Sequence, residues 1–153
     1  MNTIHAILYG ARLVHSLPIL KIVETGVADT IDIATWCSKN LGATFVSVDL
    51  DAVAQEKNHT ALEQLNAASS YTYRTQDHNK FLMQLTWIDI AFLNPENLQD
   101  GLEEFKLALS AGARTIIMRD YQSRAYLAVK QAKRFGWEAH FTGDYSILIR
   151  ATN

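Results

Sequence analysis

Short apolar segments with the character of β-strands alternate along most of this chain with longer segments of helical periodicity. A leading helix, residues 4–17, is expected before Pro18, and two closing strands are expected around the turn Gly143-Asp144. The strands are expected at residues 19–24, 44–49, 71–75, 88–93, 115–118, 137–142 and 145–150, and the other helices at residues 30–41, 51–68, 79–85, 98–109 and 122–135. This alternation predicts a doubly wound α/β fold, in which helices cover both faces of a mainly parallel sheet and the final hairpin adds one antiparallel strand.

The chain offers no place for a domain boundary. It has 153 residues, of which 48% are hydrophobic and 20% charged, and its two prolines and seven glycines form no linker. We therefore expect one domain over residues 1–153, with residues 1–18 as its leading helical segment. Its apolar runs are shorter than the roughly 20 residues that cross a bilayer. Together with the single cysteine, Cys37, which we expect to be a buried structural thiol, this favours the cytoplasm and argues against a membrane partner.

Charge is distributed unevenly along the chain. The net charge of −2 argues against a general nucleic-acid binder, which would carry a basic excess. Residues 1–105, however, carry a net charge of −7 and residues 106–153 a net charge of +5. This asymmetry is compatible with head-to-tail self-association, with a basic patch for an acidic ligand, or simply with two differently solvated faces of one domain.

Ligands of doubly wound sheets lie beyond the carboxyl ends of the strands, where the strand order reverses. The first such turn, Glu24–Thr30, contains one glycine, Gly26, where the backbone bends sharply. Ala28 and Thr30 stand where a dinucleotide-binding loop would have further glycines, and Asp29 would repel a phosphate. A nicotinamide dinucleotide is therefore disfavoured, and a ligand with an ammonium group suits this acidic edge better.

The second strand ends on a carboxylate, Asp49, 23 residues after Gly26. A carboxylate at this place can accept two hydrogen bonds from a ribose diol. Lys21–Gly26, Phe45–Asp49, Thr75–Asp77 and Ile88–Asn94 together resemble the motifs of class I S-adenosylmethionine-dependent methyltransferases, closest to the small O-methyltransferase-like group. The resemblance extends over about residues 20–150. It implies a Rossmann-like sheet with strand order 3-2-1-4-5-7-6 and an antiparallel seventh strand.

The resemblance also implies a cofactor, S-adenosyl-L-methionine, and residues to bind it. Its methionine moiety would lie at the first turn, its ribose hydroxyls at Asp49, its adenine at Asp77, and its reacting methyl group in front of Asn94. The full set of expected cofactor-binding residues is Glu24, Thr25, Gly26, Asp29, Asp49, Leu50, Asp77 and Asn94.

Departures from the family pattern bear on catalysis. Asn94 and Tyr121 replace two metal ligands of the metal-dependent O-methyltransferases and only Asp120 remains, so we expect no metal. Asp120, His78 and Asn94 are the candidates to orient or deprotonate the acceptor. Arg119 and Tyr121 are candidate substrate-binding residues, although an ion pair with the neighbouring Asp120 is the simpler explanation of Arg119.

These observations support a methyltransferase acting on a small-molecule acceptor. The alternative is a methyltransferase-fold module without catalytic activity, which would serve binding or assembly, because the glycine motif is thinned and the metal set is lost. A third interpretation is an enzyme that binds a nucleotide-like or sugar-phosphate ligand through Arg119. Since only the leading helix is available to cover a substrate, a closed pocket would require a partner subunit, and a homo-oligomer is expected in that case.

Overall fold

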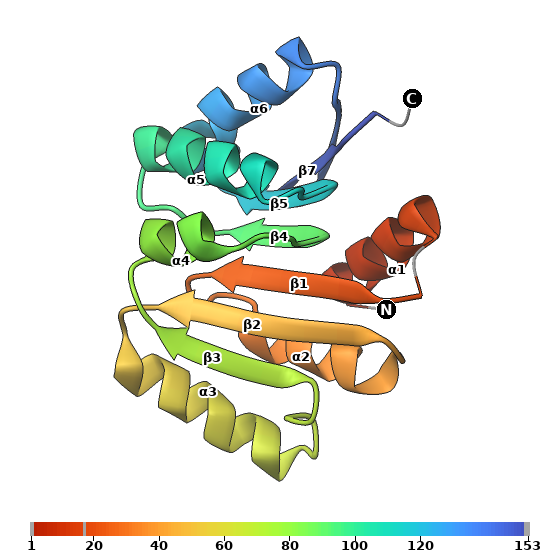
Figure 1. Ribbon diagram of the computed structural model, residues 1–153, viewed down its shortest axis with the longest axis vertical. Helices are drawn as coiled ribbons and strands as arrows, with labels where there is room; N and C mark the ends of the chain where they lie inside the picture. Colours follow the sequence, from red (N-terminus) through yellow and green to blue (C-terminus); the bar gives the residue numbers. More distant parts are fainter. Residues whose placement is uncertain (1, 17, 152–153) are drawn as a thin grey trace.

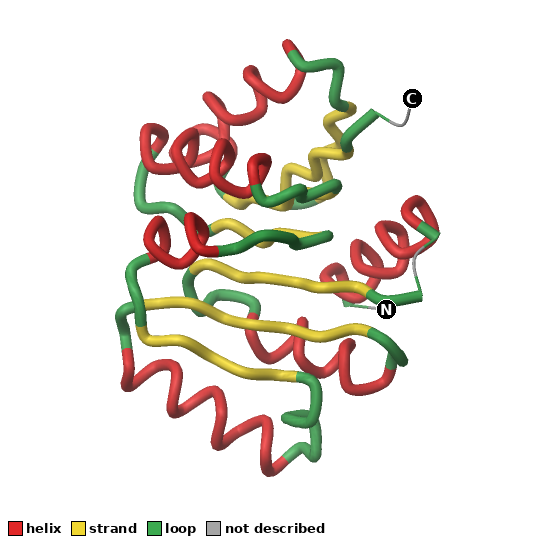
Figure 2. The backbone as a smooth tube through the Cα atoms, viewed as in Figure 1, coloured by secondary structure: helices red, strands yellow, loops and turns green. Residues whose placement is uncertain are grey.

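The computed structural model describes residues 2–16 and 18–151, and it confirms the alternation of strands and helices (Figures 1 and 2). In chain order the elements are α1 (Thr3–His15), β1 (Leu20–Thr25), α2 (Thr30–Lys39), β2 (Ala43–Asp49), α3 (Ala52–Gln64), β3 (Tyr71–Thr75), α4 (His78–Gln84), β4 (Ile90–Leu93), α5 (Leu98–Ser110), β5 (Thr115–Arg119), the π-helical turn η1 (Tyr121–Ala125), α6 (Tyr126–Arg134), β6 (Glu138–Thr142) and β7 (Tyr145–Ile149). None of the helices in these ranges has the length and apolar character needed to span a membrane.

The seven strands form one sheet in the order β3-β2-β1-β4-β5-β7-β6. β1 pairs in parallel with both β2 and β4, and β7 is antiparallel to both β5 and β6. The expected Rossmann-like topology is therefore confirmed. The strand order reverses between β1 and β4, so the carboxyl ends of these strands, at the arrowheads in Figure 1, mark the edge where a ligand is expected.

Helices cover both faces of the sheet. Because successive side chains of a strand point to opposite faces, Ile22 of β1 lies in one apolar layer and Val23 in the other. The first layer contains buried side chains of α1, α2 and α3, among them Leu8, Trp36, Cys37 and Leu62. The second contains buried side chains of α4, α5 and α6, among them Leu82, Phe105 and Val129. Both faces of the sheet are thus packed, as the continuous apolar strands predict.

The ends of several elements differ from the sequence expectation for local reasons. α1 ends at His15, because Ser16 adopts a left-handed conformation with φ +49°, and residue 17 of the expected helix lies outside the described residues. α3 ends at Gln64 instead of residue 68, because Asn66 is left-handed as well, with φ +53°. Leu65, which the periodicity assigned to the buried face, is exposed.

Two further differences concern the second half of the chain. β4 begins at Ile90 instead of residue 88, because Asp89 uses its side chain to accept a hydrogen bond from the backbone N–H of Lys21 at 2.8 Å. The last helix begins with the π-helical turn η1, where the expected helix started at residue 122. Gly101 of α5 packs directly on this turn: a Cβ there would lie 2.1 Å from the carbonyl oxygen of Arg124.

Candidate functional site at the carboxyl edge of the sheet

A groove of about 430 Å³ lies beyond the carboxyl ends of β2, β3 and β4. Its walls come from the three loops that follow these strands and from α5. It is lined by Asp49, Leu50, Asp51, Asp77, His78, Asn79, Glu96, Asp100 and Glu104, so six carboxylates surround one histidine. Four residues singled out in the sequence, Asp49, Leu50, Asp77 and His78, are thereby brought together. The volume falls in the range of roughly 300–1,000 Å³ typical of small-molecule sites.

His78 bridges two of these carboxylates. Its Nε2 lies 2.9 Å from Asp49 Oδ1, and its Nδ1 lies 3.3 Å from Glu104 Oε2. Burial alone lowers the pKa of His78, but the hydrogen bonds to Glu104 and Asp49 and the charges of both carboxylates outweigh it and raise the pKa to about 9. The imidazole is therefore charged at neutral pH, and both ring nitrogens donate hydrogen bonds.

Glu104 is a central residue of the site that sequence reasoning missed. Its side chain is almost fully buried, and it accepts a hydrogen bond from Thr25 Oγ1 at 2.5 Å in addition to the contact with His78. Thr25 in turn binds Asn94. A continuous set of hydrogen bonds therefore runs from Asn94 through Thr25, Glu104 and His78 to Asp49. The available signal was helical spacing, since Glu104 lies three residues after Gly101 and four before Ala108, both of which are buried.

Glu24 is fully buried and supports the first turn from within. Its carboxyl group accepts hydrogen bonds from Thr30 Oγ1 at 2.5 Å, from the backbone N–H of Asp29 at 2.7 Å and from Ser47 Oγ at 3.0 Å. Burial raises the pKa of Glu24 to about 8, although these hydrogen bonds oppose the rise. Glu24 does not line the groove. Its hydrogen bonds instead hold the loop after β1 in place.

The loops after β1 and β4 touch one another directly. Gly26 has φ +86°, a backbone conformation that residues with a side chain rarely adopt. A Cβ at this position would also lie only 2.9 Å from Asn94 Cβ. The backbone N–H of Asn94 donates to Thr25 Oγ1 at 3.0 Å, and its Nδ2 donates to the Thr25 carbonyl at 2.9 Å. Thr25, Gly26 and Asn94, which the resemblance assigns to the methionine end of the cofactor, are thus packed against one another.

A second cluster ties the first turn to β5 and β7. The Tyr145 hydroxyl donates to Asp29 Oδ1 at 3.0 Å, and Arg119 Nη2 donates to the Tyr145 oxygen at 2.7 Å and lies 3.3 Å from Asp29 Oδ1. Burial raises the pKa of Asp29, against the opposing charge of Arg119. These side chains and Asn94 pack so closely that no space for a water-sized molecule remains between them. Arg119 therefore pairs with Asp29 and not, as the sequence suggested, with Asp120.

Asp120 and Tyr121 lie apart from the groove. Asp120 adopts a left-handed conformation with φ +51°, its N–H donates to Asp144 Oδ1 at 3.3 Å, and its carboxylate lies 3.4 Å from Arg124 Nε. Tyr121 contacts the rings of two other aromatic side chains, Tyr126 and Phe141. Among the catalytic candidates, hydrogen bonds therefore link Asn94 and His78 within the described part of the chain but do not include Asp120.

In residues 2–16 and 18–151, no group of three or more histidine, cysteine, aspartate or glutamate side chains is arranged to hold a metal ion. The expectation of a metal-independent site stays a prediction.

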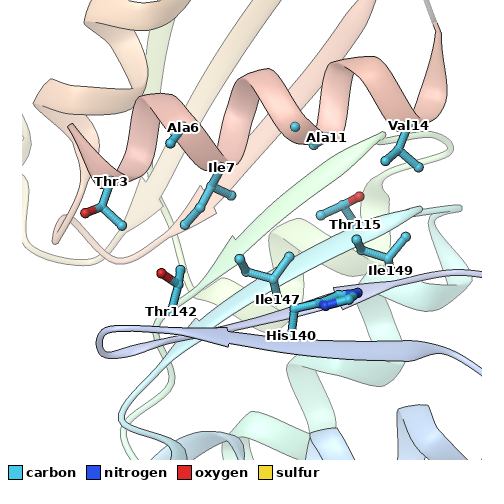
Figure 3. A pocket seen from close by; sticks show the side chains of 11 residues that line it. Thr3, Ala6, Ile7, Ala11, Val14, Thr115, His140, Thr142, Ile147 and Ile149 are labelled. Atoms are coloured by element: carbon cyan, nitrogen blue, oxygen red, sulfur yellow. The ribbon is translucent and has the colours of Figure 1, made fainter. Parts of the chain in front are cut away.

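A larger and more apolar cavity, about 510 Å³, lies between α1 and the strands β5, β6 and β7. Figure 3 shows Ile7 and Val14 of α1 across from Ile147 and Ile149 of β7, with His140 of β6 at the side. None of the site residues expected from the sequence lines this cavity. The apolar cavity and the acidic groove are therefore two separate features of the molecule.

Comparison with known proteins extends the fold assignment. No family model and no curated protein matches the chain. Among solved structures, it is similar to an S-adenosylmethionine-dependent O-methyltransferase from Thermotoga maritima, with 11% identity, a TM-score of 0.73 and coverage of 97% of this chain and 65% of the other. An rRNA methylase from Streptococcus thermophilus has 17% identity and a TM-score of 0.67, with coverage of 97% and 94%.

A third similar structure is the small RNA methyltransferase HEN1, with 12% identity and a TM-score of 0.64 over 97% of this chain. This chain spans only a quarter of that structure and about two thirds of the Thermotoga maritima enzyme. At these identities the likeness concerns the fold, and it agrees with the strand order and the antiparallel seventh strand. The chain has the fold of the class I S-adenosylmethionine-dependent methyltransferases.

Proposed function

We propose that the acidic groove binds the adenosine part of S-adenosylmethionine. The observation that carries this proposal is that Asp49, Leu50 and Asp77, three residues from two different loops, line one groove at the edge where the strand order reverses. Asp49 is only partly buried, so its carboxylate remains accessible to a ribose diol. The six carboxylates disfavour a phosphate-bearing ligand and favour a neutral or cationic one.

With the cofactor bound, the chain would transfer a methyl group to a small-molecule acceptor. S-adenosylmethionine supplies an activated methyl group on its sulfonium, so the protein contributes mainly proximity and orientation. His78 carries a proton at neutral pH and suits the role of a hydrogen-bond donor better than that of a base. Asp120, which is half exposed, stays the candidate to accept a proton, and Asn94 stays the candidate to orient the acceptor. A cytoplasmic setting stays an expectation from the sequence.

A second candidate function is a non-catalytic module with the methyltransferase fold. The specific observation in its favour is the direct packing of Gly26 on Asn94, together with the Asp29–Tyr145–Arg119 cluster. These contacts occupy the region that the methionine moiety would enter. A catalytic chain must open them when the cofactor binds, whereas a module that binds only adenosine, or a protein partner, would keep them.

Calorimetric titration separates these functions. Wild-type protein is titrated with S-adenosylmethionine, S-adenosylhomocysteine and adenosine, and the titrations are repeated with Asp49→Ala and with Glu56→Gln, which removes an exposed carboxylate of α3. We expect micromolar binding that Asp49→Ala weakens at least tenfold, because a hydrogen bond to a charged group contributes about 1.5–3 kcal/mol. Glu56→Gln should bind as wild type does. Absence of binding by folded wild-type protein would refute the adenosine site.

The same three ligands also test whether the methionine moiety of the cofactor contributes to binding. If S-adenosylhomocysteine binds no more tightly than adenosine, the contacts between Gly26 and Asn94 stay closed and the non-catalytic module is favoured. If it binds more tightly, the methionine moiety contributes, and a panel of small acceptors is then screened for release of S-adenosylhomocysteine.

A further inference from the structure

Three aromatic rings gather on the outer side of the molecule at η1, α6 and β6. Tyr121 packs edge-on against Tyr126, with ring centroids 5.6 Å apart, and against Phe141, with ring centroids 5.4 Å apart. Phe141 is 54% exposed and Tyr126 39% exposed. Tyr126 and Phe141, which both contact the half-buried Tyr121, present apolar faces to solvent, and such faces mark an interaction site when they are clustered.

Basic side chains surround the same rings. Lys130 Nζ lies 5.4 Å from the centroid of Tyr126, and Lys133 Nζ lies 6.0 Å from that of Phe141. Arg124 of η1 and Arg134 of α6 are two further basic residues here, of which Arg124 is paired with Asp120 at 3.4 Å. Residues 121–137 contain four Lys or Arg and no Asp or Glu, and Glu138 follows at the start of β6. Within the described residues, no carboxylate pairs with Lys130, Lys133 or Arg134. The aromatic-basic surface, made of Tyr121, Arg124, Tyr126, Lys130, Lys133 and Phe141, is therefore a locally cationic platform.

The place of this surface in the fold separates it from the acidic groove. Its elements follow β5 and end at β6, one of the two edge strands of the sheet, whereas the groove lies beyond β2, β3 and β4. Charges are screened over about 8–10 Å at physiological salt, so a polyanion responds to the local cations and not to the net charge of the chain. The expectation that nucleic acid is an unlikely partner used that net charge, and it does not apply to this surface.

We propose that the aromatic-basic surface binds single-stranded nucleic acid. Bases would stack on the exposed rings of Tyr126 and Phe141, and Lys130 and Lys133 would move from those rings to neighbouring phosphates. Rings with exposed faces beside cations match unstacked bases on a phosphate backbone, whereas the bases of a duplex are stacked and hidden. An acidic peptide or an anionic membrane would use the lysines but would not require base stacking. The proposal does not depend on cofactor binding.

The first test asks whether binding depends on the positive charges of Lys130 and Lys133. A fluorescein-labelled 12-nucleotide oligouridine is titrated with full-length protein in about 50 mM salt without cofactor, and binding is followed by fluorescence anisotropy. We expect affinity to fall with salt, and Lys130→Glu and Lys133→Glu each to weaken binding by about tenfold or more and to reduce the salt slope by about 0.7. Lys57→Glu makes the same change on the exposed side of α3 and should bind as wild type does. No binding by wild type, or equal losses in all three variants, would overturn the proposal.

The second test asks whether binding depends on stacking between bases and the rings of Tyr126 and Phe141. Phe141→Ala and Tyr126→Ala are each expected to weaken binding about tenfold, and thermal unfolding checks that both variants remain folded. A 12-residue abasic oligonucleotide with the same phosphates should bind about as weakly as these variants bind the oligouridine. Equal affinity for the abasic and normal strands would overturn the proposal and identify a general anion surface. Binding to phosphatidylserine vesicles in place of the oligouridine would overturn it in favour of a membrane.

Discussion

His78 holds together two carboxylates of the groove that come from different elements. Its imidazole lies between Asp49 at the end of β2 and Glu104 on α5, so one cation offsets two negative charges that would otherwise repel each other. A ribose at Asp49 would compete with His78 for the same carboxylate oxygen. The histidine is therefore both a cation that holds the groove together and the group that a ligand must displace or join.

The raised pKa of His78 predicts a pH-dependent stability. The group is charged in both states below its ordinary pKa of 6.5, so its ion pairs stabilise the folded chain fully there. As the pH rises through about 9, the folded state loses the proton and this contribution disappears. We expect His78→Gln to lower the free energy of unfolding by about 2 kcal/mol at pH 6.5 and by much less near pH 10. Urea unfolding at several pH values measures this difference.

His140→Gln is the matched control, because His140 also contacts a carboxylate, Glu138 at 3.1 Å, but both of these side chains are exposed. It should follow the wild-type pH dependence closely, since exposed ion pairs contribute little. A difference between His78→Gln and wild type that stayed constant from pH 6.5 to pH 10 would mean that packing, not charge, explains the role of His78.

The individual site residues differ in how far the sequence could reveal them. Asp49 and Asp77 follow strands, so the topology of a parallel sheet is enough to predict that they lie at one edge. Glu104 comes from a helix, so no strand end indicates it, and only its helical spacing from Gly101 and Ala108 suggests that it is buried. The bond between Asp29 and Tyr145 joins residues 116 positions apart, and no local pattern encodes such a pairing.

At the scale of elements, α5 connects the two halves of the molecule. Its Glu104 reaches the groove, while its Gly101 lies against η1, the turn that begins the aromatic-basic surface. A Cβ at Gly101 would lie 2.1 Å from a backbone carbonyl oxygen, which cannot move without shifting the turn. The close approach of α5 and η1 therefore depends on the absence of a side chain at this position.

Two glycine substitutions test this contact against ordinary helix propensity. Gly101→Ala should lower the free energy of unfolding by about 1–3 kcal/mol, because the added methyl group overpacks a rigid contact. Gly10→Ala, in α1 with no atom within 4 Å of the new Cβ, should raise it by up to about 1 kcal/mol. Chemical denaturation of both variants measures the two shifts. If Gly101→Ala were as stable as Gly10→Ala, the tight packing of α5 on η1 would be wrong.

The elements themselves were largely predictable because their periodicity is strong. Residues 71–75 form β3 with the expected bounds, and the sheet has the strand order that the family resemblance implied. The predictions failed at the ends of elements, where one side chain or one backbone angle determines the last residue. Asp89 shortens β4 by bonding to β1, and the left-handed Asn66 stops α3, neither of which a hydrophobic pattern records.

At the scale of the whole molecule, the uneven charge of the sequence becomes a spatial polarity. Residues 1–105 supply β3, β2, β1 and β4, one side of the sheet, and residues 106–153 supply β5, β7 and β6, the other. The segment with net charge −7 and the segment with net charge +5 therefore lie toward opposite ends of the sheet. Such a molecule is suited to head-to-tail contacts between copies.

Light scattering after size exclusion tests this polarity. We expect association that increases with concentration at about 20 mM salt and is lost at about 500 mM, because salt screens contacts between opposite charges. Lys130→Glu and Lys133→Glu together should weaken the association, since they reduce the positive end. A protein that stayed monomeric at low salt would rule out head-to-tail assembly and leave the uneven charge as a matter of solvation.

In the proposed function, the acidic groove at the carboxyl edge holds the adenosine of the cofactor. A crystal structure of the chain with S-adenosylhomocysteine tests it most directly. We expect adenosine in the groove, with its ribose at Asp49 and its adenine beside Asp77, and a shift of His78 away from the occupied carboxylate oxygen. Ligand density in the apolar cavity between α1 and β7, with the groove unchanged, would contradict it.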